Sequence, residues 1–421
     1  MVTKTNQKAF FFLRHNNDID HMIPVIYKWA SNENVPTDVI VTTSKDLLDD
    51  YRVKLLKKFK NVNLFYINDW YKSHTLTHLF FNKYFKYISE SDKLIKKYRL
   101  VKRIANKAIK RFTKKLFKDV ESAIVCFDWT DTYFVQQVLK AAKQKGFTTV
   151  SLPHGDRPYA SRLELNEDLN YDVLTTYKTS DIFDYIVVPN KLVSERYEPF
   201  LDINRIKILG SPRYSDEWMN IIEKHIPEFD IKGSKNKLKI VFFLRNTGYP
   251  IFWDEVVRTF KLILQFDEIF LVVKHHPRAT NAKKITNDLL ANYSDVRDKV
   301  GKNLHFDFGK IKSESILKWA DIVIDIGTSV TWSTVKQKKP VLMIEYLYAN
   351  HSVIAYYMKS SEIKCRDDLY KTLESFLKNK NQKFYNEKER KKFIEDVIDY
   401  PDKKVLERYV RFLRKCLDES T

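Results

Sequence analysis

Polar side chains that could bind an anion follow three short apolar segments in the second half of the chain. The segments are KIVFFL, IFLVV and IVIDI, and each runs into cations, amides or hydroxyls. Cations and hydroxyls beside the free amides of a helix start favour phosphate binding. We therefore predict that the following residues bind the phosphates of a ligand: Arg245, Asn246, His276, Pro277, Arg278, Gly327, Thr328 and Ser329.

Two further turns extend this predicted phosphate-binding site. Glu345 ends the apolar run VLMIE, where its carboxylate could accept hydrogen bonds from ribose hydroxyls. Gly210 and Ser211 follow the run IKIL and precede a predicted helix, so they could contact the pyrophosphate of the same ligand. A purely structural turn explains Gly210 and Ser211 equally well.

A histidine with the properties of a general base lies in the segment LPHGDRPY, residues 152–159. Pro153 and Gly155 bracket His154, which predicts a sharp turn just after an apolar strand. Imidazole titrates near neutrality, so His154 is a candidate base for an acceptor hydroxyl. A hydrogen bond to a backbone carbonyl in a tight turn is the structural alternative. Two flanking residues are predicted to contact the acceptor, Asp156 and Arg157.

The segment RHNNDIDH, residues 14–21, gathers charged and imidazole side chains in the loop after the first apolar run. Asp18 and Asp20 are alternative general bases, although capping of the following helix could explain one of them. The remaining side chains are assigned to acceptor binding: Arg14, His15 and His21. No other residues complete a ligand set, and no D-x-D motif ends a strand, so we predict neither a metal nor another cofactor.

The spacing of these clusters implies the elements that position them. Short β-branched and aromatic runs alternate with helix-length segments, which is typical of parallel sheets with crossover helices. Ligands of such sheets bind at the carboxyl ends of the strands. The segment FFFLRHN at 10–16 is echoed by FFLRN at 242–246, which predicts two similar α/β domains. The hydrophobic periodicity stops in the stretch 223–237, which contains Pro, Gly and Lys residues, and we place the boundary between the two domains there.

The chain has 421 residues and a formal net charge of +20. The charge is densest at 91–119, where apolar residues recur every three or four positions, so a basic amphipathic helix is predicted. An anionic membrane surface is its predicted partner, with a solvated helix face as the alternative; nucleic acid is not, because no nucleic-acid motif accompanies the charge. The sequence contains no long apolar run and no signal peptide, so we expect a cytoplasmic protein, peripheral on the inner face of the membrane.

The motifs HHPR, DIGTS and KKPVLMIEY together resemble the donor half of GT-B glycosyltransferases, in particular bacterial capsule and sialic-acid-type transferases that use CMP sugars. The segment PHGDRPY with the same motifs also resembles the CDP-glycerol glycerophosphotransferase group of teichoic-acid and capsule enzymes. By that pattern, His154 would be the base, and His276, Thr328 and Ser329 would hold the donor phosphates.

These observations predict an α/β protein of the GT-B class, with two Rossmann-like domains whose mainly parallel sheets face a cleft, and a helical C-terminal tail. Residues 1–225 would bind the acceptor, residues 238–400 the nucleotide donor, and the helix at 401–421 would pack back on the first domain. The expected reaction transfers a sugar from a CMP-, UDP- or GDP-linked donor to a lipid-linked surface glycan, such as capsule or lipopolysaccharide.

Three alternatives remain open from the sequence. The first is a CDP-polyol phosphotransferase of the teichoic-acid type, in which the acceptor attacks phosphorus. The second is a non-hydrolysing UDP-sugar 2-epimerase, whose fold has similar strand ends. The third is a non-catalytic basic protein that binds membranes or nucleic acid, for which a steep salt dependence of binding is expected.

Overall fold

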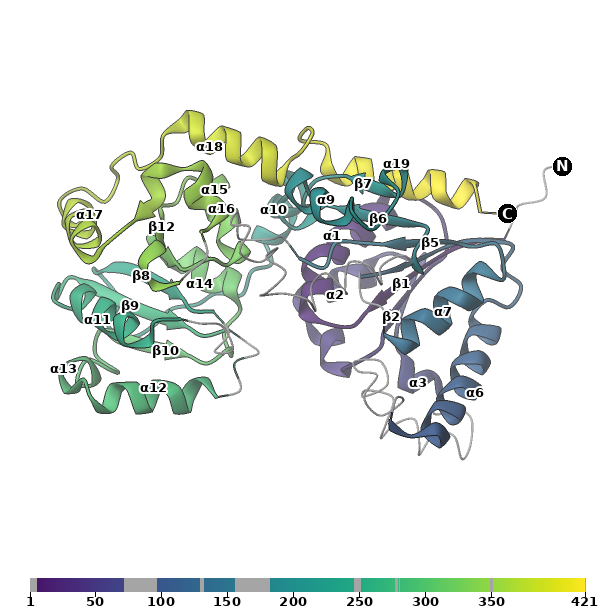
Figure 1. Ribbon diagram of the computed structural model, residues 1–421, viewed down its shortest axis with the longest axis horizontal. Coiled ribbons are helices and arrows are strands. Elements are labelled where there is room, and N and C mark those ends of the chain that lie inside the picture. Colours follow the sequence, from purple (N-terminus) through teal and green to yellow (C-terminus); the bar gives the residue numbers. More distant parts are fainter. Residues whose placement is uncertain are drawn as a thin grey trace. The chain divides into compact units, whose positions relative to one another are not determined.

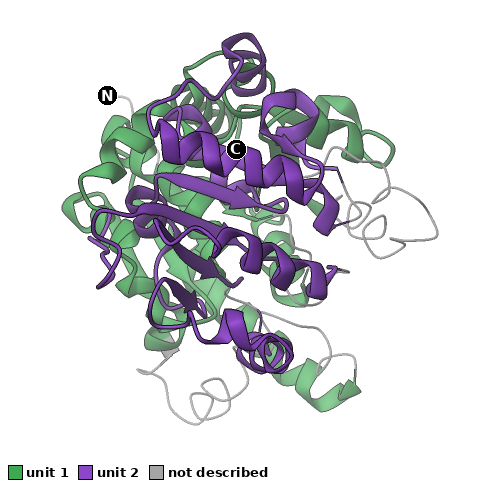
Figure 2. Cartoon of the chain, turned by 90° about the vertical axis from the view of Figure 1, so that its left-hand side faces the viewer, with its two compact units in different colours: residues 1–156, 167–225, 395–421 green, residues 157–166, 226–394 purple. Residues whose placement is uncertain are grey.

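The computed structural model describes residues 6–71, 97–128, 132–155, 182–245, 251–276, 279, 281–348 and 351–420 (Figure 1). The chain divides into two compact units (Figure 2). Unit 1 comprises residues 1–156, 167–225 and 395–421, and unit 2 comprises residues 157–166 and 226–394. Each unit contains one parallel β-sheet, which confirms the predicted α/β class.

The sheet of unit 1 has seven parallel strands in the order β3-β2-β1-β4-β5-β6-β7. In chain order the strands are β1 (Gln7–Leu13), β2 (Thr37–Val41), β3 (Val62–Tyr66), β4 (Ser122–Phe127), β5 (Thr148–Ser151), β6 (Tyr185–Val188) and β7 (Ile206–Ile208). The main helices of the unit are α1 (Asn16–Asn32), α6 (Arg99–Leu116), α7 (Tyr133–Lys143), α9 (Lys191–Tyr197), α10 (Asp216–Glu223) and α19 (Val405–Asp418).

Alternate side chains of β1 enter two different cores, as the two-residue repeat of a strand requires. Phe10 and Phe12 pack among residues of α6 and α7. Phe11 and Leu13 pack on the opposite face, among residues of α1 and α19. Both faces of the central strand are therefore covered by helices, which explains why β1 reads as a continuous apolar run.

The C-terminal segment is part of unit 1 and closes against β7. Gly210 has φ +89°, and a Cβ there would lie 2.8 Å from Val405 and 2.9 Å from Arg408. Its carbonyl accepts a hydrogen bond from the Tyr409 hydroxyl at 2.9 Å. Glycine is therefore required at this position for the close approach of the C-terminal segment.

The sheet of unit 2 has six parallel strands in the order β10-β9-β8-β11-β12-β13. The strands are β8 (Leu238–Phe243), β9 (Ile269–Lys274), β10 (Leu304–Asp307), β11 (Ile322–Asp325), β12 (Val341–Ile344) and β13 (Glu362–Ile363). The helices of the unit are α11 (Trp253–Ile263), α12 (Ala282–Ala291), α13 (Ser294–Arg297), α14 (Ser313–Trp319), α15 (Trp332–Lys336), α16 (Val353–Tyr357), α17 (Arg366–Lys378) and α18 (Glu387–Phe393).

The two sheets share one topology. In each sheet the first strand, β1 or β8, lies between the second strand and the fourth, so the chain order reverses beside it. Loops that leave the carboxyl ends of the two strands flanking such a reversal diverge, and the space between them is where ligands bind in open α/β sheets. Arg14 and Arg245, the two arginines of the sequence echo, each follow the first strand of their sheet and lie at this position.

Candidate functional site

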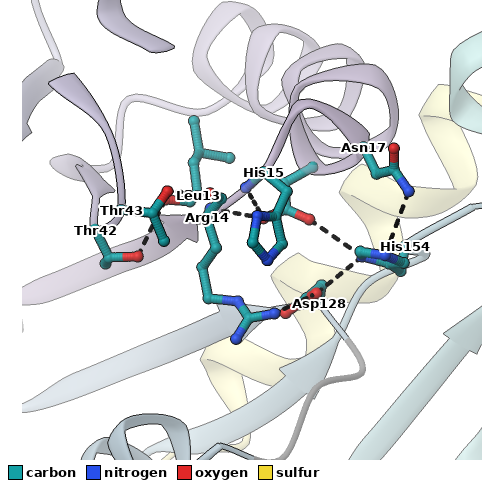
Figure 3. Close-up of polar contacts among 9 residues, drawn as sticks. Leu13, Arg14, His15, Asn17, Thr42, Thr43, Asp128 and His154 are labelled. Carbon is teal, nitrogen blue, oxygen red and sulfur yellow. Dashed lines mark hydrogen bonds and ion pairs between the residues drawn. The ribbon is translucent and has the colours of Figure 1, made fainter. Parts of the chain in front are cut away.

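Four side chains meet at the strand-order reversal of unit 1, and Figure 3 shows most of their contacts. His154 follows β5, and its Nδ1 lies 2.9 Å from a carboxylate oxygen of Asp128, which follows β4. The same nitrogen lies 3.4 Å from Asp18 in the first turn of α1. Arg14, directly after β1, donates to Asp128 at 3.0 Å. Three strand ends and one helix start therefore supply a single centre.

The charges of this centre balance. Arg14 and Asp128 are almost fully buried, at 2% and 0% exposure, and so is Asp18. A buried carboxylate is stable only when cations or hydrogen-bond donors compensate it. Arg14 and a protonated His154 supply two positive charges against the two carboxylates, so the centre is neutral when the imidazole carries its proton.

Asp18 holds the loop rather than standing free as a base. Its Oδ2 accepts hydrogen bonds from the backbone amides of Arg14 at 2.6 Å and His15 at 3.0 Å. It thereby forms the capping box that starts α1 at Asn16. These bonds fix the backbone that carries Arg14 against Asp128, so we assign Asp18 a positioning role.

The second ring nitrogen of His154 is the atom placed to exchange a proton. Nδ1 faces Asp128, whereas Nε2 lies 3.3 Å from the side-chain amide of Asn17 (Figure 3). The ring of His15 packs edge-on at 6.4 Å between ring centroids. The side chain of His154 is 16% exposed, in contrast to its buried partners. A carboxylate on Nδ1 orients the ring so that Nε2 can accept a proton from a substrate.

The environment changes the pKa of His154 in two opposite directions. Burial is the largest single effect and favours the neutral ring, but the hydrogen bonds and negative charges of Asp128 and Asp18 outweigh it and raise the pKa to about 9. His154 is therefore an imidazolium at neutral pH. It becomes a base only after losing this proton, and it is then a stronger base than an ordinary histidine.

Asp18, Asp128 and His154 also place three ligand atoms within 4.8 Å of one another, close enough to hold a metal ion. The chemistry of the set argues against a divalent cation. Arg14 already neutralises Asp128, and a metal would have to displace the proton of His154.

Asp20 and His21 lie in α1 with other partners. Asp20 forms ion pairs with Arg52 and, at 2.8 Å, with Arg213. His21 is buried, and burial together with the nearby Arg213 holds its pKa well below its usual value. The ion pairs of Asp20 explain that carboxylate without a catalytic role.

In unit 2 the equivalent position is organised around Asp325, the last residue of β11. Its carboxylate accepts from the amides of Gly327 and Thr328, both at 3.0 Å, and from the Thr331 hydroxyl at 2.8 Å. Burial raises the pKa of Asp325 to about 7, against these hydrogen bonds, which lower it. The carboxyl group shapes the GTS turn, and Gly327 adopts φ 108° within it.

Arg245 also contacts this turn. It donates to the Gly327 carbonyl at 3.3 Å, and its guanidinium lies 5.2 Å from the ring centroid of Tyr348. Thr328 caps the short helical turn that begins at Ser329. The structure thus brings Arg245, Gly327 and Thr328 together, as the anion-site prediction requires.

The adjacent histidines after β9 differ in environment. His275 is buried, its ring stacks on Phe308 at 5.0 Å, and burial lowers its pKa to about 4. His276 is half-buried and follows it at the strand end. The rest of the predicted donor and acceptor loops, Asn246, Pro277, Arg278, Asp156 and Arg157, lies outside the described residues.

The outer donor residues have structural partners. Glu345 accepts hydrogen bonds from the His351 ring and, at 3.4 Å, from the Ser352 amide. Ser211 is buried, and its backbone amide donates a hydrogen bond to the Ile398 carbonyl at 2.7 Å. Together with the packing of Gly210 against Val405, this favours the structural alternative for the Gly-Ser turn.

Asp128 and Asn17 belong to the unit 1 centre but were not predicted from the sequence. Asp128 ends the run AIVCFD in the same way that Asp325 ends IVID. That parallel is the signal that could have identified it, because each aspartate lies at the end of the fourth strand of its sheet, beside the strand that the arginine follows. Asn17 carries no comparable signal, since an amide in the first turn of a helix is common.

No protein-family model matches the chain, and no curated protein matches it in sequence. Solved structures do resemble it. UDP-GlcNAc 2-epimerase from Neisseria meningitidis bound to UDP-GlcNAc has a TM-score of 0.57 at 11% identity, covering 98% of this chain and 100% of that one. The Methanocaldococcus jannaschii UDP-GlcNAc 2-epimerase has a TM-score of 0.56 at 15% identity, covering 97% of this chain and 99% of that one. Anabaena HepE in complex with UDP and glucose has a TM-score of 0.52 at 9% identity, covering 98% of this chain and 99% of that one.

Similarity at these identities shows the fold. The chain has the two-domain, GT-B-like α/β fold with a mostly helical tail, as the sequence predicted. No specific family follows from it, so the resemblance to capsule transferases and to the CDP-glycerol group holds at the level of this fold.

Proposed function

We propose that this chain is an enzyme acting on a nucleotide-activated sugar, and specifically a metal-independent glycosyltransferase. The observation that carries the proposal is the buried Asp128 carboxylate that holds Nδ1 of His154 at 2.9 Å and leaves Nε2 toward the more exposed side. The neighbours solved with UDP-GlcNAc, or with UDP and glucose, support a nucleotide sugar as the ligand class.

The proposed reaction moves one proton. The oxygen of an acceptor hydroxyl attacks the anomeric carbon, the bond between that carbon and the nucleotide phosphate breaks, and Nε2 of the neutral His154 takes the hydroxyl proton. Asp128 stabilises the imidazolium that forms. In unit 2, Arg245, His276 and the hydroxyls of Thr328 and Ser329 would stabilise the charge of the departing nucleotide. The acceptor would be a glycan of the cell surface, such as capsule or lipopolysaccharide.

The chemistry of the centre supports transfer over rearrangement of the donor. Asp18 is held by two backbone amides, and Asp128 is held by Arg14 and His154. Among the described residues of this centre, His154 is thus the one group placed to exchange a proton with a substrate. Transfer to a hydroxyl requires one such group, whereas inversion at a sugar carbon requires removal of a proton on one face and its return on the other.

UDP-sugar 2-epimerisation is the second candidate, and the fold comparisons favour it, since several of the similar structures are UDP-GlcNAc 2-epimerases. An epimerase needs no acceptor and exchanges the hydrogen on C2 with solvent. A CDP-polyol phosphotransferase would instead require an acceptor but release CMP.

Incubation in D2O distinguishes these reactions. The protein is mixed with UDP-, GDP- and CMP-sugars or CDP-glycerol, with and without acceptor glycan, and products are followed by NMR and nucleotide release. Glycosyl transfer predicts nucleotide release only with acceptor and no deuterium at C2. Deuterium at C2 without acceptor would establish epimerisation instead. A thermal-shift screen of the same nucleotides selects the donor beforehand, because ligands of the native state raise its melting temperature.

A further inference from the structure

Helix α6 has one face buried in unit 1 and one basic face exposed. Ala108, Ile109, Phe112 and Leu116 recur at three- and four-residue spacing and pack in the core with β1 and α7. The helix lies beside α7 in Figure 1. This packing fixes the opposite face toward the outside of the unit.

The exposed face of α6 carries cations and no acidic side chain of the helix itself. Six of its basic side chains are exposed: Arg99, Arg103, Lys107, Lys110, Arg111 and Lys114. No aspartate or glutamate occurs between residues 97 and 118. Within the described part of the chain, none of these six side chains forms an ion pair, whereas surface lysines elsewhere do, such as Lys28 with Glu217 and Lys261 with Asp295.

This arrangement weakens the helix in isolation. Arg99 and Arg103, Arg103 and Lys107, and Lys107 and Arg111 are like-charge pairs four residues apart, and such pairs destabilise a helix. A solvated helix face gains stability from acidic residues at the same spacing, which are absent here. A negatively charged binding partner would remove the repulsion.

Two apolar side chains begin this face. Leu100 is 69% exposed and Tyr98 is 46% exposed. Leu100 lies three, seven and eleven residues before Arg103, Lys107 and Arg111, so helical spacing places it on the basic face. An exposed leucine among cations gives no advantage in water or against a phosphate backbone. It does match a bilayer interface, where apolar side chains enter between the headgroups and cations remain among them.

We propose that the basic face of α6, residues 98–114, binds the surface of an anionic lipid bilayer, with Leu100 and Tyr98 entering the interfacial region. The electrostatic part of this binding acts within about 8 Å at physiological salt. The apolar part persists when salt is added. The proposal concerns a surface of unit 1 and does not depend on the proposed chemistry.

Sedimentation with vesicles tests the proposal. The full-length protein is expected to bind phosphatidylcholine vesicles containing about one third phosphatidylglycerol, and to bind pure phosphatidylcholine far less. The variant R103Q/K107Q/K110Q/K114Q should lose at least about 100-fold in partition coefficient, since each cation near an anionic surface contributes about fivefold. Its replaced side chains are exposed, so the fold should persist; the double variants R103Q/K107Q and K110Q/K114Q provide the same test with smaller changes.

A matched control removes the same charge elsewhere. The variant K302Q/K318Q/K371Q/K380Q changes four exposed lysines of unit 2 and should bind vesicles within a fewfold of wild type. Equal losses in both variants would mean that net charge alone drives binding, and no loss in the α6 variant would overturn the proposal directly.

The apolar contribution has its own test. Leu100→Ser should lower partition by about three- to tenfold without changing the slope of binding against salt. Tighter binding of the wild-type protein to duplex DNA or RNA than to the anionic vesicles at the same salt, together with an unaffected Leu100→Ser variant, would show a nucleic-acid surface instead.

Discussion

The two sheets have the same strand order and the same residue types at their reversal points, but they use them differently. Each has an arginine after its first strand, Arg14 or Arg245, and an aspartate at the end of its fourth strand, Asp128 or Asp325. In unit 1, Asp128 contacts two cationic side chains. In unit 2, Asp325 contacts two backbone amides and a hydroxyl.

The difference follows from the groups that surround each carboxylate. Paired with Arg14 and His154, Asp128 raises the pKa of the His154 imidazole and forms a centre suited to proton transfer. Surrounded by two amides and a hydroxyl, Asp325 instead shapes the turn that carries the hydroxyls of Thr328 and Ser329. One topology thus provides the proposed reacting position in unit 1 and the proposed binding position in unit 2.

The largest expected effect is on turnover in unit 1. His154→Ala should lower kcat by about 10²–10⁴-fold while leaving nucleotide affinity unchanged, because a lost general base affects the chemical step. Kinetics and calorimetry on the same sample measure both quantities. His225→Ala, at an exposed histidine, is the control. If Asp18→Asn or Asp20→Asn abolishes turnover while His154→Ala retains most of it, the base is a carboxylate.

The pH dependence of kcat/KM should report the pKa of His154 as Asp128 raises it. Because the folded pKa is about 9, the base form is scarce at neutral pH, and kcat/KM should rise about tenfold per pH unit before levelling near pH 9. Asp128→Asn removes a charge and a hydrogen bond that raise this pKa, so the break should move at least about one unit lower. A rate that falls above pH 9 would show instead that the imidazolium is the active form.

In unit 2 the expected effect is on affinity. His276→Ala should weaken nucleotide binding by about 1–3 kcal/mol, the cost of removing a donor to a charged group. Calorimetry measures it, with His154→Ala as the matched control in the other sheet. The comparison of the two units fails if both variants affect affinity equally, or if His276→Ala binds nucleotide as tightly as wild type.

The buried acid of unit 2 should affect stability rather than rate. Because the folded pKa of Asp325 is raised to about 7, the native state holds its proton more tightly than the unfolded chain, and stability falls as pH rises from about 4 to about 7. Asp325→Asn lacks this dependence, so its stability relative to wild type should improve across that range, by at most about 4 kcal/mol. Urea unfolding at several pH values measures it. Asp288 is exposed, so the variant Asp288→Asn is the control: it tests whether removing any carboxylate changes the pH dependence of stability in the same way.

A chelator should have the smallest effect. EDTA is expected to leave kcat unchanged, because Arg14 and protonated His154 already compensate the carboxylates of the unit 1 centre. Loss of activity that Mg²⁺ or Mn²⁺ restores would assign a metal to Asp18, Asp128 and His154, whose ligand atoms are close enough to bind one.

More residues of the proposed binding position than of the proposed reacting position were predicted from the sequence. Arg245, Gly327 and Thr328 were recognisable because each follows an apolar strand with a turn residue or hydroxyl, and the structure brings them together. His154 was recognisable from its turn. Asp128 was not singled out, because a lone aspartate after a strand gains its meaning only from its neighbours. Asp20 had the right residue type but lies in ion pairs with Arg52 and Arg213.

The sequence by itself determined the elements of this protein. Its apolar runs specify buried parallel strands, its echo of FFFLR and FFLR specifies two such sheets, and its strand-end residues specify which side chains are available. The tertiary structure decided which strand ends meet. Arg14 and Asp128 are 114 positions apart, and they touch because β4 inserts beside β1 rather than beside β3. Strand order depends on how crossover helices pack on both faces of the sheet, and local apolar patterns do not encode it.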